Sequence, residues 1–333
     1  MSTQTLHRRD GFLPAVTDRI RGRYLSPVAS FVLFVALFAT IVVRYGFSSP
    51  SQVFLNLLVD NAHLIVLAVG MTFVILTGGI DLSVGSVVAL STVILAKTLE
   101  SGWPAPVAIV FVLLAGTVLG LLMGTVIEYF DVQPFIVTLA GMFLARGLCY
   151  VISVGTLPIK DPLLRKLGLN YLYLYEDKFI RWTVVIALIV VVAAIYVLHE
   201  TRFGRTVYAI GGSRQSAQLM GLAAARTQVC VYVISGFCAA LAGVLLGVQK
   251  LSGYSLNGIG LELDAIAAAV IGGVLLSGGV GFVLGAVIGV LVLGTIQVFV
   301  TTENLDSYWT RIMTGVLLLV FVLVQRVLVR DTR

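Results

Sequence analysis

Charged residues are scarce in this chain of 333 residues. Asp, Glu, Lys and Arg make up only 11% of it, whereas a soluble domain keeps about 25% of its residues charged. Hydrophobic residues make up 59%, and the mean hydropathy is +1.05. Apolar runs of about 20 residues recur without period-two alternation, which is typical of membrane-spanning helices. The composition therefore predicts an all-α polytopic membrane protein.

Motifs for catalysis and metal binding are missing as well. The three cysteines all lie inside apolar runs, so no disulfide framework or metal site is indicated. The chain has no GxxxxGK[ST] phosphate loop, so we expect no ATP hydrolysis by this chain itself. The chain has only three histidines and contains no HExxH or Ser/His/Asp pattern, so the sequence does not support an intramembrane enzyme. We expect no catalytic residue, no cofactor and no metal. The net charge is +6, but the Lys and Arg residues are not interleaved with aromatic residues, so nucleic-acid binding is not indicated.

Ten apolar runs predict ten transmembrane helices. The basic residues agree with this count, because Lys and Arg accumulate on the cytoplasmic side of a membrane. They gather in the N-terminal segment, the loop 199–227 and the C-terminal tail, which share one side only if even numbers of spans separate them. Both termini are therefore expected in the cytoplasm. The predicted spans lie near 27–45, 61–78, 84–99, 105–128, 134–153, 179–198, 228–248, 262–276, 281–300 and 309–328.

The whole chain is expected to form one transmembrane domain with two inverted five-helix halves. An odd number of spans in each half makes the halves run in opposite directions, as in many transporters with a central pathway. The tyrosines of the external loop suit a membrane interface, with contact to an external partner as the alternative. The predicted parts are 1–25 (cytoplasmic segment), 26–155 (first half), 154–178 (periplasmic loop) and 179–330 (second half, with the cytoplasmic loop 199–227).

Acidic residues interrupt the apolar pattern at equivalent places in the two halves. The sequence "GIDLS" (79–83) follows the second span and "GLELD" (260–264) follows the seventh. An acidic side chain in mid-helix in lipid costs about 2.5–3.5 kcal/mol. Asp81 and Asp264 are therefore expected to cap the helices that begin beside them or to line a polar route, and the two roles are compatible.

Further polar residues extend this hypothetical pathway. Arg146 is the one basic residue well inside a span, and it either reaches toward the external face or pairs with Asp81, Glu262 or Asp264. Asp60, Asn61 and His63 begin the second span and can form an outer polar mouth. The residues that we expect along the pathway are Asn61, Asp81, Ser83, Ser86, Arg146, Glu262 and Asp264.

Small residues recur every fourth position in two spans. Glycines at this spacing allow helices to approach closely, so we expect contacts within the core or between subunits rather than a chemical site. These glycines are Gly116, Gly120 and Gly124 in the fourth span and Gly281, Gly285 and Gly289 in the ninth.

The loop 199–227 is the longest cytoplasmic segment between spans. Gly211 and Gly212 are expected to end one element, and Ser213 or Ser216 can cap a short helix formed by "QSAQLMGLAAA". This helix is expected to lie along the membrane surface. It either only connects two spans or gives a soluble partner a hold on the membrane domain.

Three segments together resemble the permease subunits of bacterial ABC sugar importers of the ribose/xylose/galactofuranose family. They are "GMTFVILTGGIDLSVGSVVAL", "TRFGRTVYAIGGSRQSAQLMGL" and "ELDAIAAAVIGGVLLSGGVG". The resemblance covers about residues 50–327. The shorter stretches "PFIVTLAGMFLARG", "LLSGGVG" and "SYWTRI" are most similar to one permease of the galactofuranose transporter.

This resemblance implies a function and a set of partners. The chain would be a non-enzymatic subunit in the bacterial inner membrane that imports a monosaccharide, with galactofuranose the first candidate. Its partners would be a cytoplasmic twin-cassette ATPase that binds ATP and Mg, a periplasmic sugar-binding protein, and a second permease that is either a related chain or another copy. The residues implied in ATPase coupling are Gly212, Ser213, Arg214, Ser216, Ala217, Met220 and Gly221.

A second class of function competes with this interpretation. A secondary transporter or channel driven by an ion gradient would need no ATPase, and Asp81 with Arg146 could form its coupled pair. The spans lack a series of buried acids and histidines suited to such an ion path.

Overall fold

The structure is a computed structural model that describes residues 12–175, 178–306 and 308–330. Part of the predicted cytoplasmic segment 1–25, part of the loop 154–178 and the chain end lie outside these residues. The helices are α1 (Phe12–Tyr45), α2 (Pro50–Asp60), α3 (Ala62–Leu76), α4 (Val84–Glu100), α5 (Ala105–Tyr129), α6 (Pro134–Ile152), α7 (Pro162–Leu169), α8 (Trp182–Glu200), α9 (Arg202–Gly212), α10 (Arg214–Leu219), α11 (Ala224–Lys250), α12 (Leu261–Ile271), α13 (Val283–Thr302) and α14 (Tyr308–Arg330).

The predicted all-helical membrane protein is confirmed, but its ten-span, inverted-repeat architecture is not. Six helices in the described residues are long and apolar enough to cross a membrane, and the number is seven if α2 and α3 form one bent span. Each of the ten predicted ranges overlaps a helix. However, α12 has 11 residues and is therefore about 16 Å long, which is shorter than a hydrocarbon core of about 30 Å.

A sharp bend joins α2 to α3. The two helices meet at Asn61 at an angle of 60°, and the Asn61 side chain donates a hydrogen bond from Nδ2 to the carbonyl of Leu57, 2.9 Å away. The predicted second span began at residue 61, so the separate helix α2 was missed. Its run "PSQVFLNLLVD" is too short and too polar to be recognised as a span.

Helix α11 packs on α3, α4 and α5. Its closest contact is with α5, where a Cβ at Gly120 would lie 2.2 Å from the carbonyl oxygen of Tyr232 and one at Gly116 would lie 2.5 Å from the Cβ of Ala240. Gly124 faces Val229 of α11 in the same way. The α5–α11 contact is thus nearly backbone to backbone, which small residues permit.

A second close contact joins α13 to α12. A Cβ at Gly285 would lie 2.0 Å from the carbonyl oxygen of Gly272, and one at Gly289 would lie 1.9 Å from that of Ala268. Gly281 does not belong to this helical face, contrary to the predicted span 281–300. It precedes α13 in the loop 272–282 with a φ of 152°, where a Cβ would lie 2.9 Å from Val274.

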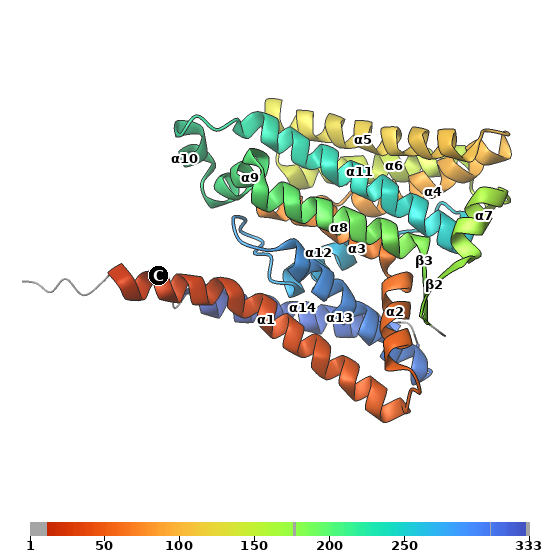
Figure 1. The fold of residues 1–333 in the computed structure, drawn as a ribbon. Helices are drawn as coiled ribbons and strands as arrows, with labels where there is room; N and C mark the ends of the chain where they lie inside the picture. Colours follow the sequence, from red (N-terminus) through yellow and green to blue (C-terminus); the bar gives the residue numbers. More distant parts are fainter. Residues whose placement is uncertain (1–11, 176–177, 307, 331–333) are drawn as a thin grey trace, which may run out of the picture.

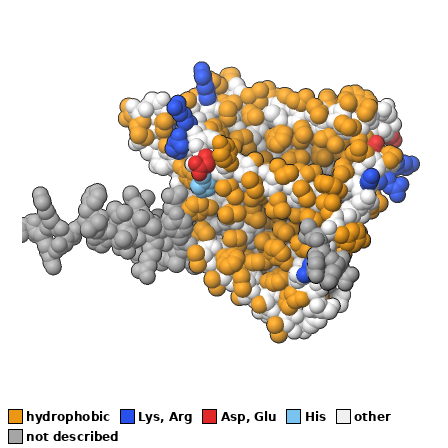
Figure 2. Space-filling model, viewed as in Figure 1, with side chains coloured by type: hydrophobic (Ala, Val, Ile, Leu, Met, Phe, Trp, Pro, Cys, Tyr) orange, Lys and Arg blue, Asp and Glu red, His pale blue; other side chains and the backbone are white. Residues whose placement is uncertain are grey.

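Figure 1 shows two distinct ends of the bundle. One end holds α9, α10, the start of α1 and the C-terminal end, and the other holds α7 and the hairpin of β2 (Tyr171–Tyr175) and β3 (Lys178–Arg181). We call these the α10 end and the hairpin end. Hydrophobic side chains cover most of the face seen in Figure 2, and the visible charged side chains lie toward the two ends, as expected for a bundle in lipid.

The hairpin end is more ordered than a simple loop. β1 (Leu157–Pro158) pairs with β4 (Ser252–Gly253) in an antiparallel ladder, and the amide of Ile159 donates to the carbonyl of Leu251 over 2.8 Å. Asp161 caps α7 by accepting from the amide of Leu164. The segment after α6 is therefore fastened to the segment after α11.

Candidate functional site

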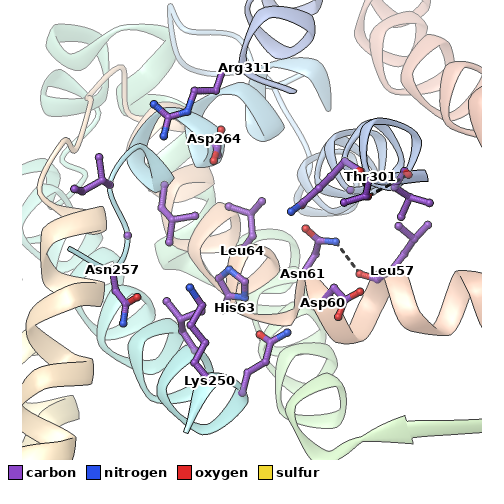
Figure 3. Close-up of a pocket in the computed structure, with 18 of the residues that line it drawn as sticks. Leu57, Asp60, Asn61, His63, Leu64, Lys250, Asn257, Asp264, Thr301 and Arg311 are labelled. Carbon is purple, nitrogen blue, oxygen red and sulfur yellow. Dashed lines mark hydrogen bonds between the residues drawn. The ribbon is translucent and has the colours of Figure 1, made fainter. Parts of the chain in front are cut away.

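A pocket of about 810 Å³ lies among α2, α3, α11, α13 and α14 toward the hairpin end. Figure 3 shows its labelled residues converging from these helices, from the segment before α12 and from α12 itself. Leucines form much of the wall, and acidic, basic and amide side chains are set between them. The polar lining residues are Asp60, Asn61, His63, Gln249, Lys250, Asn257, Asp264, Gln297, Thr301 and Arg311.

The charges of the pocket are balanced. Asp60 and Asp264 are its acids, and Lys250 and Arg311 are its bases. In Figure 3, Arg311 lies beside Asp264, and Lys250 lies on the same side as His63. Carboxylates accept hydrogen bonds, ammonium and guanidinium groups donate them, and amides do both. Such a lining can bind the hydroxyl groups of a neutral solute without favouring an ion of one sign.

One wall of the pocket is held in place by Arg146. This residue of α6 donates from Nη1 to the carbonyls of Ser255 and Asn257, the latter over 2.9 Å. Both carbonyls belong to the segment before α12 that lines the pocket. In the described part of the chain Arg146 forms no ion pair with Asp81, Glu262 or Asp264, so the coupled pair considered for an ion-driven transporter is not formed.

The pocket wall also touches the start of α4. Gly258 lines the pocket, and a Cβ there would lie 2.4 Å from the carbonyl oxygen of Gly85. A Cβ at Gly85 would in turn lie 2.0 Å from Oε2 of Glu262. Glu262 thus lies against α4, and the two acidic segments 79–83 and 260–264 are joined through Gly85.

Asp81 is completely buried and fully hydrogen-bonded on the other side of this contact. Its Oδ1 accepts from the amide of Ser83 at 3.0 Å and from the Ser83 hydroxyl at 2.6 Å, and its Oδ2 accepts from the hydroxyl of Ser235 in α11 at 2.7 Å. The hydroxyl of Tyr232, one turn earlier in α11, is buried near Gly79 without a hydrogen-bond partner in the described residues. We call Asp81, Ser83, Tyr232 and Ser235 the Asp81 cluster.

The Asp81 cluster lies deep within the bundle. Ser235 is eleven residues beyond Ala224, the first of the 27 residues of α11, so it lies about 17 Å from that end and about 23 Å from the end at Lys250. The carboxylate is therefore far from both ends of α11, a depth that sequence reasoning left open.

The capping roles expected for the two aspartates are wrong in detail. Ser83 is the N-cap of α4, and Asp81 bonds to it from two residues earlier. Gly260 is the N-cap of α12, and Asp264 follows within the first turn, where it lines the pocket. Glu262 accepts from the amide of Gly260 at 3.3 Å. The carboxylates of Asp81 and Asp264 still lie near the N-terminal ends of α4 and α12, where the positive end of the helix dipole favours a negative charge.

The α10 end carries the residues implied in ATPase coupling. α9 ends at Gly212, and the Ser213 hydroxyl caps α10 by accepting from the amide of Ser216 at 3.3 Å. Ala217 is buried, whereas Leu219 is 89% exposed and Met220 is 67% exposed. Gly221 has a φ of +75° and turns the chain toward α11. An apolar pair at this polar end of the bundle is a surface that another protein can cover.

The α9–α10 segment contacts the loop 272–282 and the end of α3. A Cβ at Gly211 would lie 1.9 Å from the carbonyl oxygen of Leu76 and 2.2 Å from the amide of Gly279. The amide of Gly279 donates to that same Leu76 carbonyl at 2.9 Å, and the Tyr208 hydroxyl donates to the carbonyl of Gly281 at 2.8 Å. Leu76 lies five residues before Asp81, so these contacts lead directly to the Asp81 cluster.

The structure separates the predicted pathway residues into two groups. Asn61 and Asp264 line the pocket, whereas Asp81, Ser83 and the buried Ser86 lie around the start of α4. Sequence reasoning missed Lys250, Asn257, Gln297 and Arg311. The two basic residues among them lie near the ends of predicted spans, where a positive charge is ordinarily attributed to topology, so no distinctive signal was available.

Comparisons with known proteins identify relatives along most of the chain. Residues 53–322 match the family described as "Branched-chain amino acid transport system / permease component". The chain is 45% identical over 283 residues to the inner membrane ABC transporter permease protein YjfF of Escherichia coli K12, covering 84% of this chain and 85% of that protein. It is 44% identical over 312 residues to the fructose import permease protein FruG of Bifidobacterium longum, covering 91% and 90%.

A third relative is aligned over almost its full length. The ribose import permease protein RbsC of Escherichia coli K12 is 35% identical over 326 residues, covering 97% of this chain and 98% of that protein. No solved structure gives a significant match. A bundle with a polar pocket at one end and an exposed short helix at the other, together with these relatives, leads to one conclusion: the chain belongs to the family of bacterial ABC transporter permeases, whose members are non-catalytic transport subunits.

Proposed function

We propose that this chain is the permease subunit of an ATP-driven importer that brings a monosaccharide into the cytoplasm. The observation that carries this proposal is a series of close contacts, joined by short backbone segments, that leads from the exposed α10 to the polar pocket. Its partners are a cytoplasmic twin-cassette ATPase and a periplasmic sugar-binding protein. The hairpin end faces the periplasm, and the α10 end faces the cytoplasm.

The pocket is the entrance for the solute. Its volume of about 810 Å³ falls in the range of 300–1,000 Å³ typical of small-molecule sites, which is ample for one monosaccharide. Asn61, Asn257 and Thr301 offer neutral donors and acceptors for hydroxyl groups, and the charges are of both signs. A permease that receives sugar from a binding protein benefits from such weak, distributed contacts, because tight binding would slow release.

The α10 helix is the contact with the ATPase. Leu219 and Met220 supply its exposed apolar surface, and Gly211 transmits displacement to the Leu76–Gly279 contact. From there the motion reaches the Asp81 cluster, which fastens the α3–α4 connection to the middle of α11. Closure of the cassettes on ATP would thus change the contact of α4 with the pocket wall at Gly85.

Galactofuranose is our first candidate for the sugar. It is supported by the similarity of "PFIVTLAGMFLARG", "LLSGGVG" and "SYWTRI" to a galactofuranose permease. Fructose and ribose follow, because two relatives are named as importers of these sugars. We propose a second permease, a related chain or another copy, as the neighbour that completes the pathway.

The proposal is tested by uptake into proteoliposomes. The permease is reconstituted with and without the ATPase that co-purifies with it, and radiolabelled galactofuranose, fructose and ribose are supplied with the co-purifying binding protein. We expect uptake of one sugar that requires ATP inside the ATPase-containing vesicles. Uptake that persists without the ATPase and follows an imposed proton or sodium gradient would contradict the importer and favour a secondary transporter.

The ATPase contact has its own test. Replacing Ala217, which is 0% exposed, by Glu should distort α10 and abolish sugar uptake while ATP hydrolysis continues. Ala223→Glu makes the same change at an exposed position beyond α10 and serves as the control. Normal uptake by Ala217→Glu would place the ATPase contact elsewhere.

A further inference from the structure

Glu128 of α5 and Arg214 of α10 form an ion pair that links α10 to the core of the bundle. Nη2 of Arg214 lies 2.5 Å from Oε1 of Glu128, whose side chain is only 5% exposed, whereas that of Arg214 is 43% exposed. These residues are separated by 86 positions in the sequence. Among the described residues, this is the one side-chain ion pair or hydrogen bond that joins 213–221 to a helix outside the loop 199–227.

Neither charge is explained by its own helix. Glu128 lies in the last turn of α5 and Arg214 is the first residue of α10. A negative charge at a helix C-terminus and a positive charge at an N-terminus are both disfavoured by the helix dipole. A nearly buried carboxylate also loses its hydration. The attraction between the two side chains offsets part of this cost at Oε1 of Glu128, whereas Oε2 is buried without a hydrogen-bond partner among the described residues.

The pair joins α10 to a stiff part of the molecule. α5 and α11 approach so closely at Gly116 and Gly120 that little independent movement is possible. Apart from the pair, α10 is held by a small apolar cluster of Ile210, Ala217 and Ala224. α11 in turn carries Tyr232 and Ser235 of the Asp81 cluster and ends at Lys250 in the pocket.

We infer that the Glu128–Arg214 pair is the clamp that makes α10 move together with α5 and α11. This inference rests on the proposed function, and it changes the role expected for Arg214: the side chain points to the permease's own core rather than to the ATPase. Both are positioning residues. Loss of the clamp should leave the ATPase bound at Leu219 and Met220 but separate its motion from the pocket.

The test needs no knowledge of the sugar. Leu256, which lines the pocket and is 41% exposed, is replaced by cysteine in a background in which the exposed Cys230 is serine. The rate of labelling by a membrane-impermeant maleimide is measured on the purified complex with its ATPase, in the absence of nucleotide and after trapping with ATP and vanadate. The difference between the two rates reports whether the ATPase moves the pocket.

Three clamp variants are compared with one control. Glu128→Gln and Arg214→Gln should reduce the nucleotide-dependent change in labelling about tenfold, with ATPase co-purification close to that of the parent. The melting temperature should stay close to that of the parent in Glu128→Gln and should fall in Arg214→Gln, which leaves a nearly buried carboxylate unpaired. The double exchange E128R/R214E should restore most of the response, since it rebuilds the pair and places each charge at the helix end that favours it. Arg226→Gln removes an exposed charge from the first turn of α11 and should respond like the parent.

Each contrary outcome has a distinct meaning. A parent whose labelling ignores nucleotide contradicts the proposed function, and the clamp with it. If the labelling rate of the parent changes with nucleotide, and that of Glu128→Gln and Arg214→Gln changes equally, the clamp is overturned but the proposed function is not. Failure of the double exchange to exceed either single variant would show that the two side chains do not act as a pair.

Discussion

The two acidic segments of this permease are alike in sequence and opposite in environment. In "GIDLS", Asp81 is fully buried and all its hydrogen bonds come from Ser83 and Ser235. In "GLELD", Asp264 is partly exposed and lies in the pocket beside Arg311. The first segment fastens helices to each other, whereas the second presents a charge to the pocket. Equivalent positions along the chain therefore do not imply equivalent roles.

The largest effect should come from removing the buried carboxylate. Asp81→Leu leaves the hydroxyls of Ser83 and Ser235 without their acceptor, at a cost of about 1–3 kcal/mol for each buried donor left unpaired. We expect no ATP-dependent uptake and a clearly lower melting temperature in detergent. Asp81→Asn keeps an acceptor oxygen, so it should retain part of the uptake and part of the thermal stability. Equal, full uptake by the two variants would show that Asp81 does not fasten α4 to α11.

A substitution at Gly85 should affect the contact between the two segments. In Gly85→Ala the new methyl group would lie 2.0 Å from Oε2 of Glu262 and 2.6 Å from the carbonyl of Gly258. Glu262 can move, but the backbone of Gly258 must shift, so we expect a several-fold loss of uptake. Gly147→Ala, in another helix with open space around it, is the matched control. Parent-like uptake by Gly85→Ala would mean that this contact does not control the pathway.

A smaller effect is expected from Ser235→Ala. This change removes one hydrogen bond to Asp81 while Ser83 keeps its two, which corresponds to about 1.5–3 kcal/mol for a bond to a charged group. Uptake should fall less than in Asp81→Leu, and the melting temperature should decrease moderately. A double-mutant cycle with Asp81→Asn measures the coupling, and strictly additive effects would argue against a direct interaction.

The smallest effect on stability should come from Asp264→Asn. The side chain is partly exposed in a polar pocket, so the melting temperature should remain within the error of the parent. Its loss should instead alter the concentration of sugar-loaded binding protein that gives half-maximal uptake, by a few-fold. Arg311→Gln should produce a change of similar size. A large loss of stability in Asp264→Asn would show that the second acidic segment also fastens the structure.

The sequence was sufficient to predict most helices but not their lengths. Apolar composition located a helix at every predicted span, because a helix needs apolar side chains whether it is buried in lipid or in protein. The same property could not show that α12 stops after 11 residues or that α2 and α3 bend at Asn61. Those features depend on close contacts such as Gly272 with Gly285, which are made by residues distant in sequence.

The site was predictable where a residue violated the local pattern. Asp81, Asp264 and Arg146 attracted attention because a charge in an apolar run is costly. Lys250 and Arg311 sit at helix ends, where charges are ordinary, and only the fold brings them to one pocket. The partner of Glu128 was unpredictable for the same reason, since it lies on a helix that is distant in the chain.

The ladder between β1 and β4 gives α11 the geometry of a lever. It fixes the segment just beyond Lys250, while the opposite end of α11, about 40 Å away, is attached to α10. With the far end fixed, a displacement of α10 would reach Ser235 at about half its amplitude and would arrive at the pocket mainly as a small rotation. If an ATPase displaces α10, as proposed, the displacement would become smaller toward the pocket, and the pocket would open by tilting its walls rather than by sliding them apart.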